Sequence, residues 1–418
     1  MRLQSITALV ALAFSAQQAQ AIEPGFPYGS RKVRGVNLGG WLVLEPWITP
    51  SLFERTGNSA IVDEYTFGQL QSRSTAQAAL KAHWDTWITE ADFAAIADAG
   101  LNHVRIPIGY WAFEVAAGEP YISGQLPYLQ RAVEWASKYG IKVMVDLHGA
   151  PGSQNGFDNS GLRTDNPTWA TNPNNIARTN AVIKRIATLF ADDVTTVPAI
   201  APLNEPAGFR GSDWLSATRQ FWHDSYGNIR YPYGSSRKSN SVVVLHDAFE
   251  PLSSWTNFMP SPQWEGVAMD KHVYQVFSEG ELRKSEAQHI STICELGSQL
   301  SSFHLWTIIG EWSPASTDCT QWLNGRGRGA RWDGTFQNHP TLGSCQGKSG
   351  NASTFSTAYK TFLRRFWEAQ IITYEKGAGW IQWTWKAERA DDWSYQAGLA
   401  NGWIPRNPTN LLYPNICG

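Results

Sequence analysis

Ala199-Ile-Ala-Pro-Leu-Asn-Glu-Pro206 is an apolar run that ends in an amide and a carboxylate, and Leu305-Trp-Thr-Ile-Ile-Gly-Glu-Trp312 is a second apolar run that ends in a carboxylate. Both runs have the length and composition of a buried β-strand, so Glu205 and Glu311 each stand where a strand ends. In a barrel of parallel strands that end carries the chemistry. Two such carboxylates in a chain with 21 Trp, 14 Tyr and 18 Phe indicate cleavage of a sugar–sugar bond.

Eight short apolar runs read as strands. They are Val33–Leu38, Val104–Ile108, Lys142–Leu147, Ala199–Leu203, Val242–Leu245, Gly266–Asp270, Leu305–Ile309 and Trp380–Trp383. Helical periodicity lies between them at Ala91–Gly100, Tyr128–Tyr139, Ile176–Phe190 and Phe355–Phe366. Alternating strands and helices predict an α/β fold, and eight units predict a single-domain (β/α)₈ TIM barrel. Val242–Leu245 is the weakest strand, since the edge of an open sheet has the same pattern.

Polar, titratable or aromatic residues follow nearly every predicted strand. They are Trp41 and Glu45; Arg105; Asp146 and His148; Asn204 and Glu205; His246 and Asp247; His272 and Tyr274; Glu311; and Trp385 and Lys386. In a barrel these groups would converge on one pocket. Solvated strand ends arising by chance would contain more Lys, Ser and Gly.

The residues beside the two glutamates suit the two roles in glycoside cleavage. Asn204 can donate to a sugar 2-hydroxyl, and Glu205 then suits the general acid that protonates the leaving oxygen. Glu311 would attack the anomeric carbon from the opposite face. Arg105 is a source of positive charge that would keep Glu311 ionised and nucleophilic.

His272 and Tyr274 could donate hydrogen bonds to Glu311 or to the substrate. Environments that separate the pKa values of the two glutamates would assign their roles. Each residue also has a structural interpretation. Asn-Glu-Pro is a good helix start, a buried Arg–Glu pair can be a structural bridge, and His148 can be a core histidine with satisfied hydrogen bonds.

Residues 1–21 have the layout of a secretory signal peptide: Arg2, an apolar stretch from Ile6 to Phe14, and Ala19-Gln20-Ala21 as a cleavage site. Residues 22–418 then form the mature catalytic domain, with no later segment apolar enough for a membrane anchor and no linker composition. The protein is expected to be secreted, extracellular and monomeric.

A net charge of −2 with 17% charged residues does not indicate a nucleic-acid partner. Arg326, Arg328 and Arg331 lie among glycines and read as a loop with local hydrogen bonds.

Four cysteines imply two disulfides in an oxidising compartment, with three possible connectivities. We favour Cys319–Cys345 and Cys294–Cys417, the second of which would tie the C-terminus to the barrel. The cysteines lack the spacing of a zinc site, so we expect no metal and no organic cofactor. Asn351-Ala-Ser353 is a plausible glycosylation site in a Gly/Ser-rich surface stretch.

Longer segments carry a specific resemblance. Arg34–Trp47, Asp146–Gly161, Leu203–Pro206, His272–Phe277, Gly310–Ser313 and Trp383–Lys386 together resemble the fungal exo-β-1,3-glucanases of glycoside hydrolase family 5, in the order of that family. The motifs at Glu205 and Glu311 alone would indicate only the wider clan of retaining (β/α)₈ glycosidases. The long segments around Trp41 and Phe157 are the ones that indicate this subfamily.

The resemblance implies a retaining mechanism with Glu205 as acid/base and Glu311 as nucleophile, the carboxyl groups being roughly 5–5.5 Å apart. It implies that the terminal glucose is lined by Arg105, His148, Asn204, His272, Tyr274 and Trp385. Glu45 matches a residue that binds the outer hydroxyls of that glucose. Phe157 and Phe277 match aromatics that clamp the next glucose, with Asp158 and Asn159 beside them.

The expected function is a secreted glucan 1,3-β-glucosidase that releases glucose from non-reducing ends, because a closed pocket admits only a chain end. A relative that acts on β-1,6-glucan or on aryl or flavonoid β-glucosides is an alternative, as is a wall protein that binds or remodels glucan by transglycosylation. Lys271 replaces a frequent histidine, and Ala207–Ser225 is less familiar. These departures affect the acceptor side more than the catalytic residues.

Overall fold

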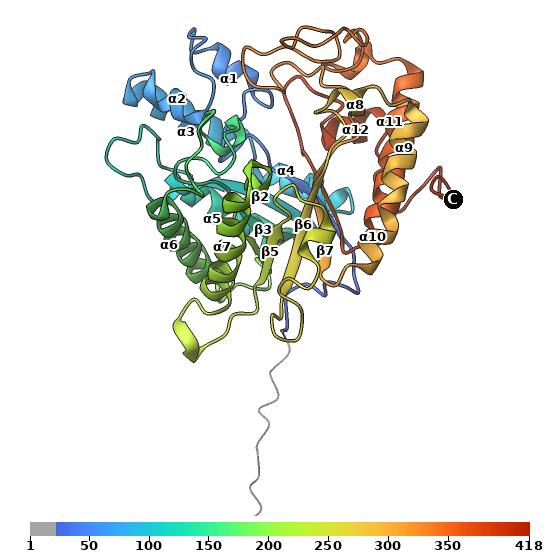
Figure 1. Cartoon of the computed structure of the whole chain (residues 1–418). Coiled ribbons are helices and arrows are strands. Elements are labelled where there is room, and N and C mark those ends of the chain that lie inside the picture. The colour runs from blue at the N-terminus through green and yellow to red at the C-terminus, as the bar shows by residue number, and fades with distance from the viewer. Residues whose placement is uncertain (1–21) are drawn as a thin grey trace, which may run out of the picture.

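The computed structural model describes residues 22–418 as a closed barrel of eight parallel strands (Figure 1). The strands are β1 (Val33–Asn37), β2 (His103–Gly109), β3 (Lys142–Gly149), β4 (Ala199–Ala201), β5 (Val242–His246), β6 (Val267–Val273), β7 (Trp306–Trp312) and β8 (Gly379–Gln382). Each strand pairs with the next, and β8 pairs with β1. The predicted barrel is therefore confirmed, including its weak fifth strand. The predicted signal peptide, residues 1–21, lies outside the described residues.

Helices connect the strands and cover the barrel (Figure 1). They are α1 (Pro50–Glu54), α2 (Glu64–Gln69), α3 (Arg73–Thr86), α4 (Glu90–Asp98), α5 (Leu126–Tyr139), α6 (Pro173–Phe190), α7 (Ser212–Arg230), α8 (Glu279–Leu282), α9 (Glu286–Glu295), α10 (Gly297–Ser302), α11 (Thr357–Tyr374) and α12 (Tyr395–Asn401). The four predicted helical segments became α4, α5, α6 and α11. The long helix α7 was not predicted; its N-cap is Gly211, which has no side chain to form a cap. Among the described residues, no helix combines the length and apolarity needed to cross a membrane.

Alternate residues of a strand share a face, and in several strands the residues that face the barrel interior change from apolar to polar toward the carboxyl end. In β3 the sequence runs from Met144, in the apolar cluster inside the barrel, to Asp146 and then His148. In β6 it runs from Ala268 to Asp270. The carboxyl half of the interior is thus a buried polar layer on an apolar base.

The register between β6 and β7 shifts by one residue just before the pair formed by His272 and Glu311. Ile309 lies opposite Lys271, but the next pair is His272 with Glu311. Such a bulge re-aims side chains at the rim of a barrel. Here it brings a histidine and a glutamate to the same level above the polar layer.

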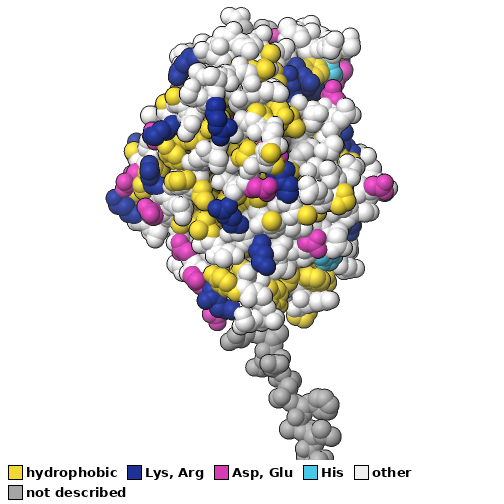
Figure 2. All heavy atoms as spheres, turned by 90° about the vertical axis from the view of Figure 1, so that its left-hand side faces the viewer, with side chains coloured by type: hydrophobic (Ala, Val, Ile, Leu, Met, Phe, Trp, Pro, Cys, Tyr) yellow, Lys and Arg dark blue, Asp and Glu magenta, His cyan; other side chains and the backbone are white. Residues whose placement is uncertain are grey.

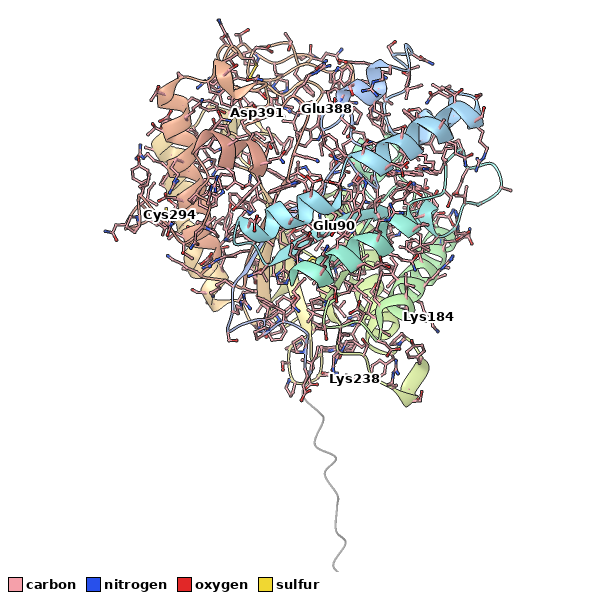
Figure 3. The ribbon with its side chains drawn as sticks, turned by 180° about the vertical axis from the view of Figure 1, so that it is seen from behind. Glu90, Lys184, Lys238, Cys294, Glu388 and Asp391 are labelled. Carbon is pink, nitrogen blue, oxygen red and sulfur yellow. A yellow bond between two sulfur atoms is a disulfide. The ribbon has the colours of Figure 1, made fainter. Side chains whose placement is uncertain are left out.

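Long loops cover the carboxyl ends of the strands, whereas the described N-terminal residues lie at the opposite end (Figure 1). Disulfides join Cys319 to Cys345 inside the loop after β7 and Cys294 to Cys417, where the C-terminus reaches α9 (Figure 3). These are the two pairs that we favoured. Asn351 is exposed in the same loop, and its glycosylation stays a prediction.

The outer face formed by α5, α6 and α7 carries basic, acidic and apolar side chains that are interspersed (Figure 2). No basic stripe of the kind that binds nucleic acid is visible on this face. The mixed surface agrees with the near-neutral charge of the chain.

Candidate active site

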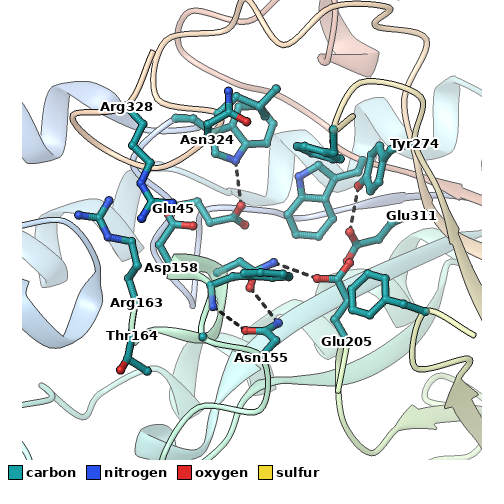
Figure 4. Close-up of a pocket in the computed structure, with 18 of the residues that line it drawn as sticks. Glu45, Asn155, Asp158, Arg163, Thr164, Glu205, Tyr274, Glu311, Asn324 and Arg328 are labelled. Atoms are coloured by element: carbon teal, nitrogen blue, oxygen red, sulfur yellow. Dashed lines mark hydrogen bonds between the residues drawn. The ribbon is translucent and has the colours of Figure 1, made fainter. Parts of the chain in front are cut away.

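A cavity of about 470 Å³ opens at the carboxyl ends of the strands (Figure 4). Eight of the predicted site residues line it: Glu45, Phe157, Asp158, Asn159, Glu205, Tyr274, Phe277 and Glu311. Four more, Arg105, His148, Asn204 and His272, have buried side chains and are connected to one another or to the glutamates by the hydrogen bonds described below. The strand-end residues of a chain of 418 residues thus meet at one place.

Glu311 lies in β7 and accepts a hydrogen bond on each carboxyl oxygen. Nη1 of Arg105 donates to Oε1 over 2.8 Å. The hydroxyl of Tyr274 donates to Oε2 over 2.9 Å (Figure 4). Glu311 is 4% exposed. Two donors directed at a buried carboxyl stabilise its ionised form and fix its orientation.

Glu205 follows β4 in a left-handed backbone conformation with φ of 47°. This conformation is uncommon for a residue with a side chain and, where it persists, it often occurs at functional sites. Oε1 of Glu205 lies 2.7 Å from Nδ1 of His272, and Oε2 accepts from Nδ2 of Asn159 over 3.1 Å. Asn159, which we predicted only to flank the aromatic clamp, therefore contacts the proposed acid directly.

His272 lies between the two glutamates. Its Nδ1 is 2.7 Å from Glu205 and 3.5 Å from Oε2 of Glu311, and its Nε2 is 3.4 Å from Oδ2 of Asp270. Both glutamates therefore hold an oxygen within 3.5 Å of the same histidine nitrogen, so their carboxyl groups face one cavity from neighbouring positions. We had expected His272 to donate to Glu311 or to the substrate, but its shorter hydrogen bond goes to Glu205.

Arg105 organises the polar layer under the glutamates. Besides Glu311, its guanidinium reaches Oδ1 of Asn37 at 3.0 Å, Oδ1 of Asn204 at 2.7 Å and Oδ1 of Asp146 at 3.2 Å. Because the carbonyl oxygen of Asn204 accepts from Arg105, its Nδ2 is the group turned away from the arginine. That orientation suits donation to a sugar hydroxyl.

His148 is held by Asp146, whose Oδ2 lies 2.6 Å from Nδ1, while Nε2 of His148 is 3.4 Å from Nδ2 of Asn204. The imidazole also stacks on the indole of Trp383 at 5.5 Å between ring centres. His148 is buried and hydrogen-bonded, as a core histidine would be. It does not line the cavity itself, but it stacks on Trp383, which does.

The charges around the glutamates shift their pKa values in opposite directions. Burial lowers the pKa of His272, but the charges of Glu311 and Asp270 outweigh it and the pKa lies well above the ordinary value. Burial raises the pKa of Glu205, but the hydrogen bond and charge of His272 leave it below the ordinary value. Burial raises the pKa of Glu311, and His272 and Arg105 offset only part of this.

We had expected the reverse order, with Arg105 holding the pKa of Glu311 down. The physical reason for the difference is that the imidazolium of His272 lies closer to Glu205 than to Glu311. The dissociable proton therefore belongs to the His272–Glu205 pair rather than to Glu205 alone.

Glu45 lies across the cavity from the glutamates. Its Oε2 accepts from the indole of Trp47 at 2.9 Å, and its buried Oε1 has no partner among the described residues. Burial and the charges of Asp158 and Glu311 raise its pKa well above the ordinary value. A neutral carboxyl with a free oxygen can both donate to and accept from a sugar hydroxyl.

Asp158 and the arginines form the wall opposite Glu205 and Glu311 (Figure 4). Burial raises the pKa of Asp158 to about 6, against the lowering by Arg163. Arg328 also lines the cavity on this side, whereas Arg326 donates to main-chain carbonyls of Asn58 and Ile61. Arg331 forms the predicted kind of local hydrogen bond, to Asn324 in the same loop, whereas the bonds of Arg326 reach a distant segment. Arg328 and Arg331 also line the cavity, which was not predicted.

Trp385 was expected to line the subsite of the terminal glucose, but the structure does not place it in the cavity wall. Its indole is buried and donates to Oδ1 of Asp92 over 2.9 Å. Trp383, two residues earlier, lines the cavity instead. Both follow the end of β8 at Gln382, so the alternation of the strand no longer determines which side chain faces inward.

Several lining residues were not singled out from the sequence. They include Trp47, Asn155, Arg163, Arg210, Phe249, Leu323, Asn324, Phe336, Trp383 and Trp393. Trp47, Asn155 and Trp383 lie inside the segments that carry the family resemblance, so the resemblance could have identified them as site residues. Phe249 follows His246 and Asp247 after β5, but nothing local distinguishes it from a core phenylalanine.

Glu205, His246 and His272 are the one group of three potential metal ligands close together in the described part of the chain. The hydrogen bonding of His272 argues against a metal there. Its Nδ1 faces Glu205 and its Nε2 faces Asp270, so as an imidazolium it offers no lone pair to an ion.

Comparison with known proteins places the chain among sugar-cleaving enzymes. Residues 63–313 match the family model described as cellulase (glycosyl hydrolase family 5). A glucan 1,3-beta-glucosidase of Blumeria graminis is 46% identical over 398 residues, covering 94% of this chain and 91% of the relative. Glucan 1,3-beta-glucosidase 2 of Wickerhamomyces anomalus is 46% identical over 400 residues, covering 93% and 91%.

Among solved structures, the rutinosidase from Aspergillus niger superposes with a TM-score of 0.71. The alignment covers 91% of this chain and 99% of that one at 19% sequence identity. At this identity the likeness shows the shared barrel fold alone.

Proposed function

The chain belongs to glycosyl hydrolase family 5, and on that premise we propose that it is a retaining exo-β-1,3-glucanase that releases glucose from non-reducing ends of β-1,3-glucans. The observation that carries the proposal is the pairing of Glu205 and Glu311 across His272 at the base of one cavity. Relatives that share 46% of their residues over nearly the whole chain are named for this activity.

In the first step we assign Glu311 as the nucleophile that attacks the anomeric carbon. Glu205 transfers a proton to the glycosidic oxygen as the carbon–oxygen bond breaks, which leaves a glycosyl ester on Glu311. The donors Arg105 and Tyr274 support this assignment, because they hold both oxygens of Glu311. Nδ2 of Asn204 is available to the 2-hydroxyl, where a hydrogen bond strengthens in the transition state.

In the second step Glu205 acts as a base. It accepts a proton from water while the water oxygen attacks the anomeric carbon and Glu311 leaves. Two displacements on opposite faces of the same carbon give glucose with the β configuration of the substrate. A sugar hydroxyl in place of water would give transglycosylation by the same route.

A general acid needs a raised pKa, yet the pKa of Glu205 lies below its ordinary value. The hydrogen bond to His272 explains how Glu205 can still supply a proton. The His272–Glu205 hydrogen bond, 2.7 Å long, holds one proton that either partner can carry. When the leaving oxygen approaches, that proton moves to the carboxyl of Glu205 and then to the sugar, and His272 becomes a neutral imidazole. The three carboxylates near His272 keep this proton bound at pH values where an isolated glutamate would have lost it.

The shape of the site supports exo action. The buried polar layer around Arg105, which rests on the apolar interior of the barrel, closes the base of the cavity, and Glu45 offers a free oxygen on the side away from the leaving group. A glucan chain can then enter only by its non-reducing end. Phe157 and Phe277, both exposed at the mouth, are suited to hold the second glucose between their faces.

We further propose that residues 1–21 are removed on secretion and that residues 22–418 act outside the cell as a monomer. Two disulfides agree with an oxidising compartment. The mass of the secreted protein, its N-terminal residue and its size in solution by light scattering would test these three statements.

The experiment that tests the function is chromatography of the first products from laminarin, with the anomer of released glucose read by NMR. Glucose alone, initially β, is the expected result. Oligosaccharide products would contradict exo action, and initial α-glucose would contradict retention. Faster cleavage of pustulan or of an aryl glucoside than of laminarin would favour the alternative substrates.

A further inference from the structure

Glu205 lies in a turn that the strand pairing of the barrel does not support. The pairing of β3 with β4 ends at Ala201, before the turn begins. Pro202 and Pro206, on either side of Glu205, have no backbone N–H to donate. The left-handed φ of 47° at Glu205 costs free energy in a residue with a side chain. The turn therefore needs contacts from elsewhere in the chain to keep the Glu205 carboxyl in one direction.

Gln154, in the loop after β3, supplies such contacts on both sides of the turn. Nε2 of its side chain donates to the main-chain oxygen of Asn204 over 3.0 Å. Its own main-chain oxygen accepts from the N–H of Ala207 over 3.1 Å. One buried residue thus holds the chain immediately before Glu205 and again shortly after it. These two hydrogen bonds continue the connection between the β3 and β4 segments beyond the end of the strand pairing.

The side-chain amide of Gln154 is held in one orientation. Besides Asn204, Nε2 donates to the main-chain oxygen of His148 over 2.8 Å, and Oε1 accepts from the N–H of Ala150 over 3.1 Å. Both N–H groups of the amide are therefore used. Turning the amide over would place its oxygen against two carbonyl oxygens and its nitrogen against an N–H. The amide consequently joins the end of β3 to the turn at Glu205 in a single geometry.

The loop that carries Gln154 is itself held in place. Ser153 is buried and left-handed, with φ of 62°, and its Oγ lies 2.7 Å from Oγ of Ser160. Strain of this kind persists where the surroundings determine the conformation. The same loop carries Asn159, whose amide donates to Oε2 of Glu205. The loop therefore fixes Glu205 twice, at the main chain through Gln154 and at the carboxyl through Asn159.

We propose that Gln154 is a positioning residue for the acid/base: it holds the main chain on both sides of Glu205 so that the carboxyl points at the glycosidic oxygen. The inference rests on the proposed function, which assigns to that carboxyl the proton transfer in both steps. Gln154 does not line the cavity and acts through Glu205. Proton transfer needs the two heavy atoms within hydrogen-bond reach, so a small displacement of the turn would slow it strongly.

A purely structural role for Gln154 makes a different prediction. If the amide only satisfied buried carbonyl oxygens, its loss would lower the free energy of unfolding. It would not slow the steps that need proton transfer more than the attack by Glu311, which lies on a different strand. The two roles can therefore be separated by comparing substrates that differ in their need for an acid.

The test compares the wild type with Gln154→Met and Gln154→Leu, which keep an apolar side chain of similar bulk but remove both N–H donors. We expect kcat/KM on laminarin to fall by about ten- to a hundredfold in both variants. The first step on a dinitrophenyl glucoside, whose leaving group needs no proton, should change by less than about threefold. Gln370→Met is the matched control, because Gln370 is also buried and its amide also donates to a main-chain carbonyl, that of Phe366 in α11.

Added azide provides a second readout on the dinitrophenyl glucoside. The azide ion attacks the anomeric carbon of the glycosyl ester, the bond to Glu311 breaks, and glucosyl azide leaves with the Glu311 carboxylate regenerated. Azide has no proton to lose and so does not need Glu205 as a base. We expect azide to raise turnover in the Gln154 variants, where removal of the proton from water limits the rate, and not in the wild type or Gln370→Met.

Equal losses on laminarin and on the dinitrophenyl glucoside would overturn the positioning role. Unchanged rates, the same difference between substrates in Gln370→Met, or failure of both Gln154 variants to fold would overturn it as well. With an active wild type, each of these results leaves the proposed function intact. A wild type that releases no glucose from laminarin would instead refute the proposed function, and the positioning role with it.

Discussion

The base of the pocket and its mouth are built in different ways. At the base, the side chains of Glu205, Glu311, Arg105 and His272 are buried, lie on or directly after barrel strands and are held by charged hydrogen bonds of 2.7–2.8 Å. At the mouth, the phenylalanines are about 40% exposed or more and are carried by loops. At the base, hydrogen bonds fix the direction of each side chain, whereas at the mouth the exposed rings offer contact area to a sugar.

The difference follows from what each part must do. Proton transfer and attack on carbon require donors and acceptors in one geometry, which buried ion pairs on a barrel provide. Holding a second or third sugar requires contact that can accommodate a flexible chain. Changes at the base should therefore lower kcat, and changes at the mouth should mainly raise KM.

Glu311→Gln should have the largest effect. The amide keeps the shape but cannot form the glycosyl ester, so turnover of laminarin should fall by more than about a thousandfold while sugar binding persists. Initial rates and calorimetric titration with laminaritriose would measure both. Glu90→Gln, in an exposed pair with Lys138, is the charge-matched control (Figure 3). Retention of more than a few per cent of activity would show that another group is the nucleophile.

Glu205→Gln should come next, with a loss of about 10²- to 10⁴-fold on laminarin because the leaving oxygen no longer receives a proton. The first step on a dinitrophenyl glucoside, whose leaving group needs no proton, should be much less affected. Pre-steady-state bursts on that substrate would separate the two steps. Equal losses on both substrates would contradict the acid role.

His272→Gln tests the shared proton. In the wild type the pair keeps its proton up to the raised pKa of His272, so kcat/KM should persist to high pH and fall only as pH passes that value. In the variant the proton resides on the Glu205 carboxyl, so the alkaline limb should move to lower pH, with roughly tenfold lower activity near neutrality. A pH–rate profile with an unmoved alkaline limb would assign the proton elsewhere.

Phe277→Ala should have the smallest effect and a different character. Loss of one face of the clamp should raise KM for laminaribiose by about two- to tenfold with little change in kcat. β-Glucosyl fluoride, which carries no second sugar, is the control substrate and should be affected less. A variant with a lower kcat on both substrates would show that Phe277 affects the bond-breaking steps. It would contradict the claim that residues at the mouth act mainly on KM.

The base could largely be predicted from the sequence. A closed barrel brings all eight carboxyl strand ends to one rim, so Glu205, Glu311, Arg105 and His272 could be assigned to one pocket from strand positions alone. Phe157 and Phe277 came only from resemblance. Phe249 could not be found, because an exposed phenylalanine in a loop has the same local pattern as a buried one.

What the sequence determined by itself was the order of strands and helices, the barrel that they close and the pair of glutamates at its rim, since these depend on local periodicity and strand ends. The tertiary structure alone decided that His272 bonds Glu205 more closely than Glu311 and that Trp383 rather than Trp385 faces the cavity. Each of these depends on distances between segments far apart in the chain, and a shift of a few tenths of an ångström or one turn of a loop changes such distances without altering any local pattern.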